Sequence, residues 1–327
     1  MTNSQLPGFS IIIPNLNGAS LLKKCLESLF LSLSRARIFD YEFILVDNHS
    51  SDQSPQAFQA FCQANHLDHV LIPLSKNCGF AHAVNTGILR SKYDYVVLVN
   101  NDITLSPDWF SHMLLPISRP SGSKTVAFTG TVLNHDGTTI ESQGLIFDDY
   151  RGKCQNINNK IPYRASQISK LPSSYVWGSS AALVIYQKKS IVEVGLFDPL
   201  FFAYEEDVDL SFRLARFGFL TLYVPQAISY HIGGATSSKM GNFRYRMDLK
   251  NWILLIIKNY SPKDILSNFF PLIIERLRNL SGLIKNTPPP LIIPSLFGVL
   301  FQVITALPQT LKNRRQLQKM LKYGTSE

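Results

Sequence analysis

The sequence predicts an α/β fold with a mostly parallel sheet, a smaller antiparallel part and a C-terminal tail of amphipathic helices. Three observations support this prediction. Apolar runs alternate with helical patterns over residues 9–102, the pattern changes near residue 125, and basic charge is concentrated after residue 243. Alternating strands and helices imply parallel strands that are joined by crossover helices.

The first hundred residues contain four short apolar runs that are typical of buried strands. They lie at 9–15, 42–50, 69–75 and 93–102, and segments with helical spacing lie at 20–33 and 81–91. Three of the strands end in pairs of polar residues, namely Asn15 and Asn17, Asp47 and Asn48, and Asn101 and Asp102. Ligands collect at the carboxyl ends of parallel strands, so we expect these pairs to share one site.

The pattern after residue 125 indicates antiparallel strands with a turn at Asp136-Gly137. Residues 175–186 are typical of one strand that Gly178 interrupts. Residues 207–218 predict a helix with Asp207 as its N-cap. A strand at 219–225 is then expected to lead into a polar, glycine-bearing loop at 228–238.

We expect residues 1–242 to form the main domain and residues 243–327 to form a basic helical tail, with amphipathic helices at 245–260 and 264–285. Residues 244–327 contain 13 Lys and Arg but only 4 Asp and Glu, so they hold the whole net charge of +9. Basic charge mixed with Leu, Ile and Phe favours an anionic membrane surface, and not nucleic acid, as the partner.

The uncharged run 291–307 is close to the minimum length of a membrane-spanning helix. Polar residues recur there and beyond at every third or fourth position, from Gln302 to Lys319. A spanning helix needs no such stripe, so we expect the tail to lie in the membrane interface. A helix packed on its own domain or on a partner chain remains an alternative.

Four carboxylates, Glu205, Glu206, Asp207 and Asp209, lie within five positions of the stretch FFAYEEDVDLSFRLARFG. Like charges this close repel one another, so a cation, a helix end or a reaction is needed to explain them. Acids in a first helical turn interact favourably with the helix dipole, which accounts for only some of the four. Arg213 follows Asp209 by four residues, and we expect these two to form an ion pair.

Eight stretches between about residues 9 and 260 together resemble the inverting family 2 glycosyltransferases. In chain order they read SIIIPNLNG, ILVDNHSSDQS, NCGFAHAVNTGI, VLVNND, HDGTTIESQG, WGSSAALVI, VGLFDPLFFAYEEDVDLSFR and YHIGGATS. The most similar subgroup contains the bacterial rhamnosyltransferase-like enzymes of surface-polysaccharide assembly. The resemblance implies a GT-A type nucleotide-sugar-binding fold with a Rossmann-like sheet.

The resemblance also implies a reaction and its participants. A sugar, rhamnose or another hexose, would move from a UDP- or dTDP-linked donor to a lipid-linked or growing polysaccharide acceptor. Asp207 would be the general base of this inverting single displacement, with a pKa raised by Glu206 and Asp209 and lowered by the helix N-terminus. The residues expected to contact the donor nucleotide are Pro14, Asn17, Asp47, Asn77, Gly79, Asn85 and Asn101.

On the acceptor side, the resemblance implies Trp177, Gly178 and Glu206. Two of the implied roles have structural alternatives. Trp177 could equally be a core aromatic residue, and Asp47 could simply start a loop through an Asx-turn.

A divalent cation, Mg²⁺ or Mn²⁺, is implied as cofactor, with Asp102 and His231 as its ligands. Family members often have two or three acids in the VNND segment, whereas this chain has Asn100 and Asn101 and so keeps one carboxylate. Mg²⁺ can still bind through one carboxylate, phosphate oxygens and water. A lone histidine is more often structural, but an imidazole ligand would favour Mn²⁺.

We expect a peripheral protein on the cytoplasmic face of the inner membrane. The four cysteines are scattered and are expected to be free thiols, and the N-terminus shows no signal-peptide pattern. Two other functions remain open. One is a nucleotidyltransferase of similar build, although PNLNGAS lacks the basic residues of a phosphate loop. The other is a non-catalytic glycan- or membrane-binding protein.

Overall fold

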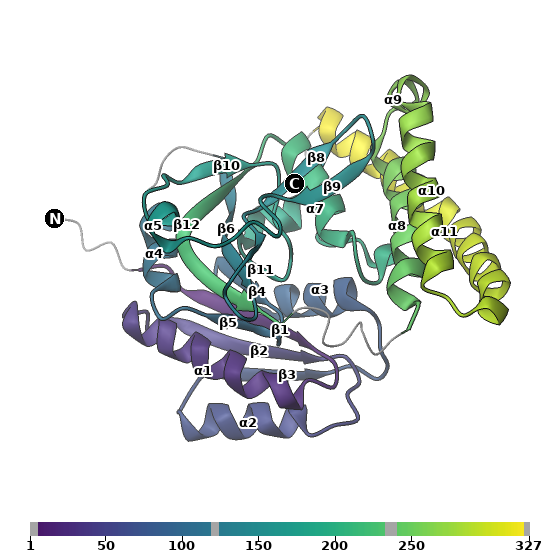
Figure 1. Cartoon of the computed structure of the whole chain (residues 1–327). Coiled ribbons are helices and arrows are strands. Elements are labelled where there is room, and N and C mark those ends of the chain that lie inside the picture. Colours follow the sequence, from purple (N-terminus) through teal and green to yellow (C-terminus); the bar gives the residue numbers. More distant parts are fainter. Residues whose placement is uncertain (1–5, 119–123, 233–240, 324–327) are drawn as a thin grey trace.

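The computed structural model describes residues 6–118, 124–232 and 241–323 (Figure 1). Its centre is a mixed sheet with the strand order β10-β12-β6-β11-β4-β1-β2-β3. Four strands of this sheet pair in parallel, as the sequence predicts. They are β1 (Phe9–Asn15), β2 (Tyr41–Asp47), β3 (His69–Pro73) and β4 (Tyr95–Val99).

The other half of the sheet is mostly antiparallel. It contains β5 (Ile103–Leu105), β6 (Thr125–Asn134), β7 (Ile140–Ser142), β10 (Ser174–Val176), β11 (Leu183–Gln187) and β12 (Leu220–His231). β11 runs antiparallel to both β4 and β6, whereas β12 runs parallel to β6. A separate hairpin consists of β8 (Leu145–Asp148) and β9 (Lys153–Asn156).

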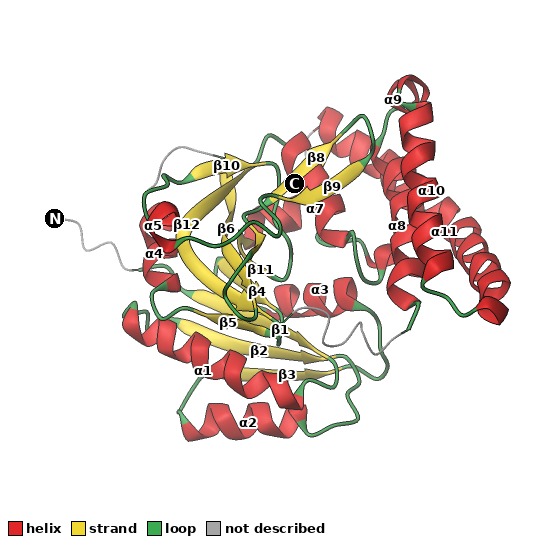
Figure 2. Ribbon diagram, in the orientation of Figure 1, coloured by secondary structure: helices red, strands yellow, loops and turns green. Residues whose placement is uncertain are grey.

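Helices cover both faces of the sheet (Figure 2). One face packs against α1 (Ala19–Arg35), α2 (Ser54–Ala64) and α4 (Trp109–Ile117). The other packs against α3 (Phe80–Arg90), α6 (Lys188–Glu193) and α7 (Glu206–Arg216). Ile11 and Ile13 of β1 face the first layer and Ile12 faces the second, because side chains alternate along a strand. Two short segments, α5 (Ala165–Ile168) and the 3₁₀ turn η1 (Pro199–Phe201), complete this part.

The structure corrects two strand predictions. Residues 175–186 contribute to two strands, β10 and β11, because the chain bends at Trp177. β10 pairs with β12 at the edge of the sheet, whereas β11 pairs with β4. The loop expected from residue 228 starts later, because β12 continues to His231 by pairing with β5 and β6. The rest of that predicted loop, residues 233–240, lies outside the described residues.

The predicted N-cap of α7 is also wrong. The cap position is occupied by Glu205, which has a left-handed backbone with φ of 64°, and its side chain makes no capping hydrogen bond. Asp207 lies inside the first turn, where its Oδ1 accepts a hydrogen bond from Val208 N at 2.8 Å. The side chain of Asp207 is therefore not used to start the helix.

The C-terminal quarter forms a layer of helices on the side of the molecule opposite α4 and α5 (Figure 1). These helices are α8 (Phe243–Asn259), α9 (Pro262–Ser267), α10 (Phe269–Lys285) and α11 (Pro289–Tyr323). The helix predicted at 264–285 is in fact two, since the chain breaks at Asn268. α8 packs against both α10 and α11 through a core that includes Leu249, Leu283 and Val299.

α8 also packs against the preceding part of the chain. Trp252 and Leu255 share a core with Phe201 and with Phe212 of α7. The boundary predicted between residues 242 and 243 therefore falls where the hydrophobic core is continuous. All four cysteines are free, as expected.

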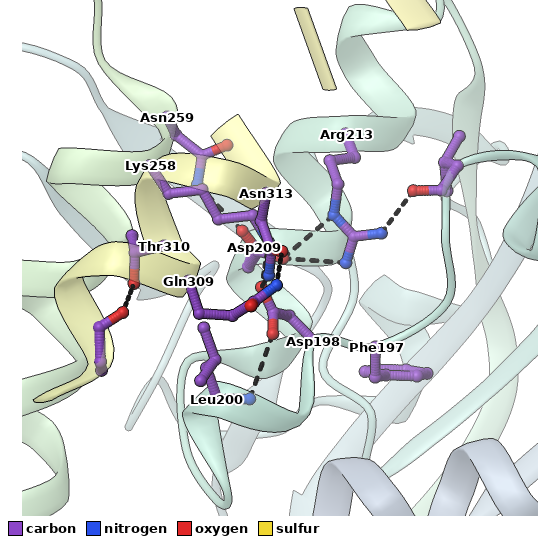
Figure 3. A network of polar contacts seen from close by, with 12 residues as sticks. Phe197, Asp198, Leu200, Asp209, Arg213, Lys258, Asn259, Gln309, Thr310 and Asn313 are labelled. Carbon is purple, nitrogen blue, oxygen red and sulfur yellow. Dashed lines mark hydrogen bonds and ion pairs between the residues drawn. The ribbon is translucent and has the colours of Figure 1, made fainter. Parts of the chain in front are cut away.

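A buried polar network joins α7, α8 and α11 (Figure 3). The ion pair predicted between Asp209 and Arg213 is confirmed, with Nη2 and Oδ2 2.8 Å apart. Lys258 of α8 lies 2.8 Å from Asp209 Oδ2 and 2.6 Å from Asp198 Oδ2, and Asn313 of α11 donates to Asp198 Oδ2 at 2.9 Å. Burial alone would raise the pKa of Asp209, but the charges of Lys258 and Arg213 oppose it and lower the pKa to about 2.

Candidate active site

A cavity of about 990 Å³ lies at the carboxyl ends of β1 and β4 and extends to α8 and α10. Eight of the site residues predicted from the sequence line it: Pro14, Asn77, Gly79, Asn101, Asp102, Glu206, Asp207 and His231. The other five, Asn17, Asp47, Asn85, Trp177 and Gly178, are separate from the lining that the structure describes.

The polar residues at the strand ends form one hydrogen-bond network, as expected from the strand pattern. Asn15 donates through Nδ2 to Asp47 Oδ1 at 3.1 Å and to Ser54 Oγ at 2.7 Å, and its Oδ1 accepts from Asn101 Nδ2 at 2.7 Å. Asp47 is buried beneath this network and its Oδ2 also accepts from Ser50 N at 3.1 Å. Asp47 thus braces the loops, and a direct contact with a nucleoside stays a prediction.

Asn17 and Asn85 hold backbone segments in place. Asn17 Oδ1 accepts from Ser51 N at 2.7 Å, which links the loop after β1 to the loop after β2. Asn85 of α3 donates to Phe197 O at 2.7 Å and accepts from Phe197 N at 3.0 Å. These contacts shape the surroundings of the cavity, and nucleotide binding by either side chain stays a prediction.

The loop before α3 is built around Asn48 and Gly79. Asn77 Oδ1 accepts from Asn48 Nδ2 at 2.9 Å and from Gly79 N at 3.0 Å, and Asn48 Oδ1 accepts from Cys78 N at 2.8 Å. Gly79 has a φ of 86°, and a Cβ there would lie 2.5 Å from Phe202 O. Only glycine allows this loop to approach the 201–205 segment so closely. Asn48 lines the cavity, as expected from its place in a strand-end pair, although the resemblance gave it no role.

Asp207 faces the cavity from the first turn of α7. Its Oδ2 accepts from Ala181 N at 3.2 Å and its Oδ1 accepts from Val208 N. Burial raises the pKa of Asp207, and these backbone N–H groups oppose the rise. The sequence had suggested neighbouring acids as the cause, but burial is the main one. A partly buried carboxylate with a raised pKa suits a general base.

The four crowded acids divide into two groups. Asp209 belongs to the buried ion network, whereas Glu205, Glu206 and Asp207 line the cavity. Burial, with the charge of Asp207, raises the pKa of Glu206 to about 8. Burial raises the pKa of Glu205 well above its usual value, and the charges of Asp248 and Asp207 add to this. The cavity therefore holds a cluster of carboxyl groups that resist ionisation together.

The segment that precedes these acids has an unusual backbone. Phe202, Tyr204 and Glu205 have φ values of 64°, 69° and 64°, a region that costs free energy for residues other than glycine. Asn251 of α8 compensates, because its Nδ2 donates to the carbonyl oxygens of Phe201, Ala203 and Tyr204 at 2.9, 2.8 and 2.7 Å. α8 thus holds the turn that positions Asp207.

His231 lies between two carboxylates at the strand end of the cavity. Its Nε2 is 3.3 Å from Asp102 Oδ1 and its Nδ1 is 2.7 Å from Glu141 Oε1. Burial alone would lower the pKa of His231, but Asp102 and Glu141 oppose it and raise the pKa to about 10. Glu141 lies in the HDGTTIESQG stretch, but it is 90 positions from His231, so the sequence did not predict that these two residues interact.

Asp102 and His231 fit as two ligands of a divalent cation. Asp102 Oδ1 is buried and accepts no well-oriented hydrogen bond from the described residues. A carboxylate behind the second ring nitrogen, here Glu141, is the usual way to orient a metal-binding histidine. Within the described ranges, no group of three or more His, Cys, Asp or Glu could hold a metal. Further ligands would have to be phosphate oxygens and water.

Trp177 and Gly178 serve the packing beside the cavity. Trp177 stacks on Phe147 with ring centroids 4.9 Å apart, and it contacts Phe212 edge-on. A Cβ at Gly178 would lie 2.4 Å from Ser211 Oγ of α7. Both residues are therefore accounted for by the packing of α7, and contact with an acceptor stays a prediction.

Comparison with known proteins gives consistent matches. Residues 10–170 match the model of glycosyl transferase family 2. An N-acetylglucosaminyl-diphospho-decaprenol L-rhamnosyltransferase of Mycobacterium tuberculosis is 27% identical over 225 residues, which are 63% of this chain and 71% of that protein.

Two solved structures share the fold over nearly the whole chain. A mannosyltransferase from Pyrobaculum calidifontis, in complex with GDP-Man and Mn²⁺, has a TM-score of 0.56 at 13% identity and covers 99% of this chain and 89% of its own. S. aureus TarS 1-349 with UDP-GlcNAc has a TM-score of 0.55 at 15% identity and covers 97% and 92%. These likenesses confirm the predicted GT-A fold.

Proposed function

The chain carries a glycosyltransferase family 2 domain, and we propose that it is an inverting enzyme that transfers a sugar to a lipid-linked acceptor. The observation that carries this proposal is the position of Asp207 in a cavity that begins at the strand ends. The strand end offers the donor side, with Pro14, Asn77 and Asn101 in its lining. The similarity to a decaprenol-linked rhamnosyltransferase supports a polyprenyl-linked acceptor and rhamnose or another hexose as the sugar.

In this mechanism Asp207 accepts the proton of the acceptor hydroxyl. The hydroxyl oxygen then attacks the anomeric carbon from the side opposite the departing nucleoside diphosphate, which inverts its configuration. Ala181 N and Val208 N keep both oxygens of Asp207 oriented for this proton transfer. A screen of UDP- and dTDP-linked sugars with a polyprenyl-diphosphate acceptor tests the proposal, and the absence of product with every donor would contradict it.

We further propose that Asp102 and His231 hold a divalent cation, either Mg²⁺ or Mn²⁺. When bound, the cation would neutralise charge on the leaving diphosphate. Glu141 accepts a hydrogen bond from His231 Nδ1 and so fixes which ring nitrogen faces Asp102. The Mn²⁺ in the mannosyltransferase complex supports a cation in this type of fold.

This assignment makes a prediction about metal-dependent binding. Asp102→Ala and His231→Ala should weaken Mn²⁺-dependent binding of UDP or dTDP by roughly tenfold or more, because each removes a ligand. Titration calorimetry with and without EDTA measures the effect. His135→Ala is the matched control, since His135 is exposed on the turn after β6. Undiminished activity in EDTA would contradict the metal assignment.

α10 and α11 both expose large apolar side chains, a set that we call the apolar patch. It consists of Phe269, Phe270, Ile273, Ile274, Leu277, Phe297, Leu300, Phe301 and Ile304, each between 44% and 76% exposed. Patches of this kind on a soluble protein usually mark an interaction surface. The opposite side of α11 is buried against the protein through Val299, Thr310 and Leu317. Asn313, part of the predicted polar stripe, faces the protein as well.

We propose that this apolar patch lies in the interface of an anionic bilayer at the cytoplasmic face of the inner membrane. α11 is long and apolar enough to span a membrane by length and composition. One side of α11 packs against α8, so an interfacial position suits this helix better than a membrane-spanning one. The excess of basic residues after residue 243 supports attraction to anionic lipids.

Flotation with vesicles tests the membrane proposal. The chain should bind vesicles rich in anionic lipid better than neutral ones, and high salt should weaken this preference because surface charges are screened over about 10 Å. The double variant Phe297→Ser, Phe301→Ser should lose binding. Phe39→Ser is the control, since Phe39 is 84% exposed and lies between α1 and β2. Resistance of wild-type binding to alkaline carbonate would instead indicate a spanning helix.

A further inference from the structure

The cavity extends past the acids of α7 to a basic end. Four cations line this end: Lys153 of β9, Arg244 of α8, and Arg276 and Arg278 of α10. Asp248 and Glu275 are the acids that line the cavity from the same helices. The basic end is thus assembled from three elements that are far apart in the sequence.

Glu275 does not neutralise this end, because several cations share it. Its carboxylate lies 2.7 Å from Arg151 Nη2, 3.0 Å from Lys153 Nζ and 2.6 Å from Arg278 Nη1. Burial alone would raise the pKa of Glu275, but hydrogen bonds from these three residues lower it to about 2. Three positive charges therefore share the single negative charge of Glu275.

Arg276 is the least satisfied of the cations. Its guanidinium lies over the Trp252 ring, 4.9 Å from the centroid, and its Nη2 donates to Gly152 O at 2.9 Å. Its Nε and Nη1 are buried and have no hydrogen-bond partner among the residues that the structure describes. The charge of Asp248 also acts on Arg276, but Asp248 Oδ2 accepts a hydrogen bond from Asn279 Nδ2, at 2.7 Å. Buried guanidinium donors without partners are costly, so this end favours an anionic ligand.

α10 separates the basic end from the apolar patch. Ile273, Ile274 and Leu277 are exposed on the outer side of the helix, whereas Arg276 lines the cavity on the inner side. An amphiphile with its chain in the bilayer and its anionic head group at Arg276 would only need to reach across one helix. This arrangement suits a polyprenyl chain that ends in phosphate groups.

We propose that the basic end is a subsite for the phosphate or diphosphate group of the acceptor. Arg276 and Arg244 bind this group, and the attached sugar then extends along the cavity towards Asp207. The inference rests on the proposed function, because it assigns the lipid-linked acceptor to this cavity. The diphosphate of the donor is assigned to the other end, near Asp102 and His231.

Binding measurements without any donor test the subsite in the full chain. The probes are farnesyl diphosphate, farnesol and inorganic pyrophosphate. We expect farnesyl diphosphate to bind most tightly, and Arg276→Gln and Arg244→Gln each to weaken it by about tenfold, as the loss of a charge-assisted hydrogen bond predicts. Farnesol binding should not change in either variant. Arg315→Gln, which removes an exposed cation of α11, is the matched control and should bind like the wild type.

Two outcomes would overturn the subsite. Unchanged affinity for farnesyl diphosphate in both variants would show that the arginines do not bind the phosphate groups. If Arg276→Gln fails to fold, Arg244→Gln alone still tests the subsite, since Arg244 is exposed. Pyrophosphate that binds as tightly as farnesyl diphosphate would overturn the assignment to a lipid. Sugar transfer is assayed separately. If farnesyl diphosphate binding depends on the arginines but no sugar is transferred, the proposed function is overturned and the subsite is not. If sugar is transferred but the binding does not depend on the arginines, only the subsite is overturned.

Discussion

Asp207→Asn is expected to lower turnover by about 100-fold or more, because it removes the group that accepts the proton of the acceptor hydroxyl. The amide has the same shape as the carboxylate, and its oxygen can still accept from Ala181 N or Val208 N. Donor binding and thermal stability should therefore change little. Turnover, donor affinity and melting temperature measured on one preparation separate loss of chemistry from loss of fold. Asp136→Asn, at an exposed turn, is the control.

The neighbouring acid provides the decisive comparison. Glu206 also lines the cavity, and burial raises its pKa to about 8. If Asp207 is the base, Glu206→Gln should retain far more activity than Asp207→Asn. The opposite order would transfer the role of base to Glu206. Because burial raises the pKa of Asp207, turnover should also fall as the pH drops through that raised value, since only the ionised carboxylate accepts a proton.

Lys258→Met should have the largest effect on stability. Lys258 lies between Asp198 and Asp209, at 2.6 and 2.8 Å, and both acids are buried. Methionine fills a similar volume but leaves the two carboxylates without their shared cation. Breaking a buried ion pair in this way costs about 3–5 kcal/mol of the free energy of unfolding. Denaturant unfolding measures the loss, and Lys263→Met at an exposed site is the control.

The same network predicts how stability depends on pH. The pKa of Asp209 is about 2 in the folded chain, below the ordinary value of about 3.9. A lowered pKa stabilises the folded state above pH 4 or so, and this contribution, about 2–3 kcal/mol, is lost as the pH falls towards 2. In Lys258→Met the acid-induced loss should be smaller. Equal acid sensitivity of the two proteins would argue against a role for Lys258 in the pKa of Asp209.

The sequence predicted the parallel half of the sheet well, because local patterns determine it. Ile11 to Ile13 alternate between two buried faces, and Asn15 ends the strand where the chain turns to α1. The meeting of Asn15, Asp47 and Asn101 followed from topology alone. The roles of Asp47 and Trp177 stay predictions, because position in a motif does not reveal which way a side chain faces.

The parts of the site that the sequence did not predict depend on long-range packing. Glu141 meets His231 across 90 positions of the chain, and Asn251 meets Ala203 across 48. Arg276 enters the cavity only because α10 folds back against α8. No local period or capping pattern encodes these encounters. They arise from the shape of the whole C-terminal layer.

The hydrogen bonds of Asn251 to the 201–204 backbone limit where this chain can be joined to a related chain in a chimera. A chimera joined at residue 243 would replace α8, and the new helix would have to present an amide to the carbonyls of Phe201, Ala203 and Tyr204. A junction after residue 260 keeps Asn251 and Lys258 beside their partners and exchanges only the helices beyond. The segment that can be exchanged between related proteins therefore begins after α8, and it is shorter than the C-terminal layer of helices.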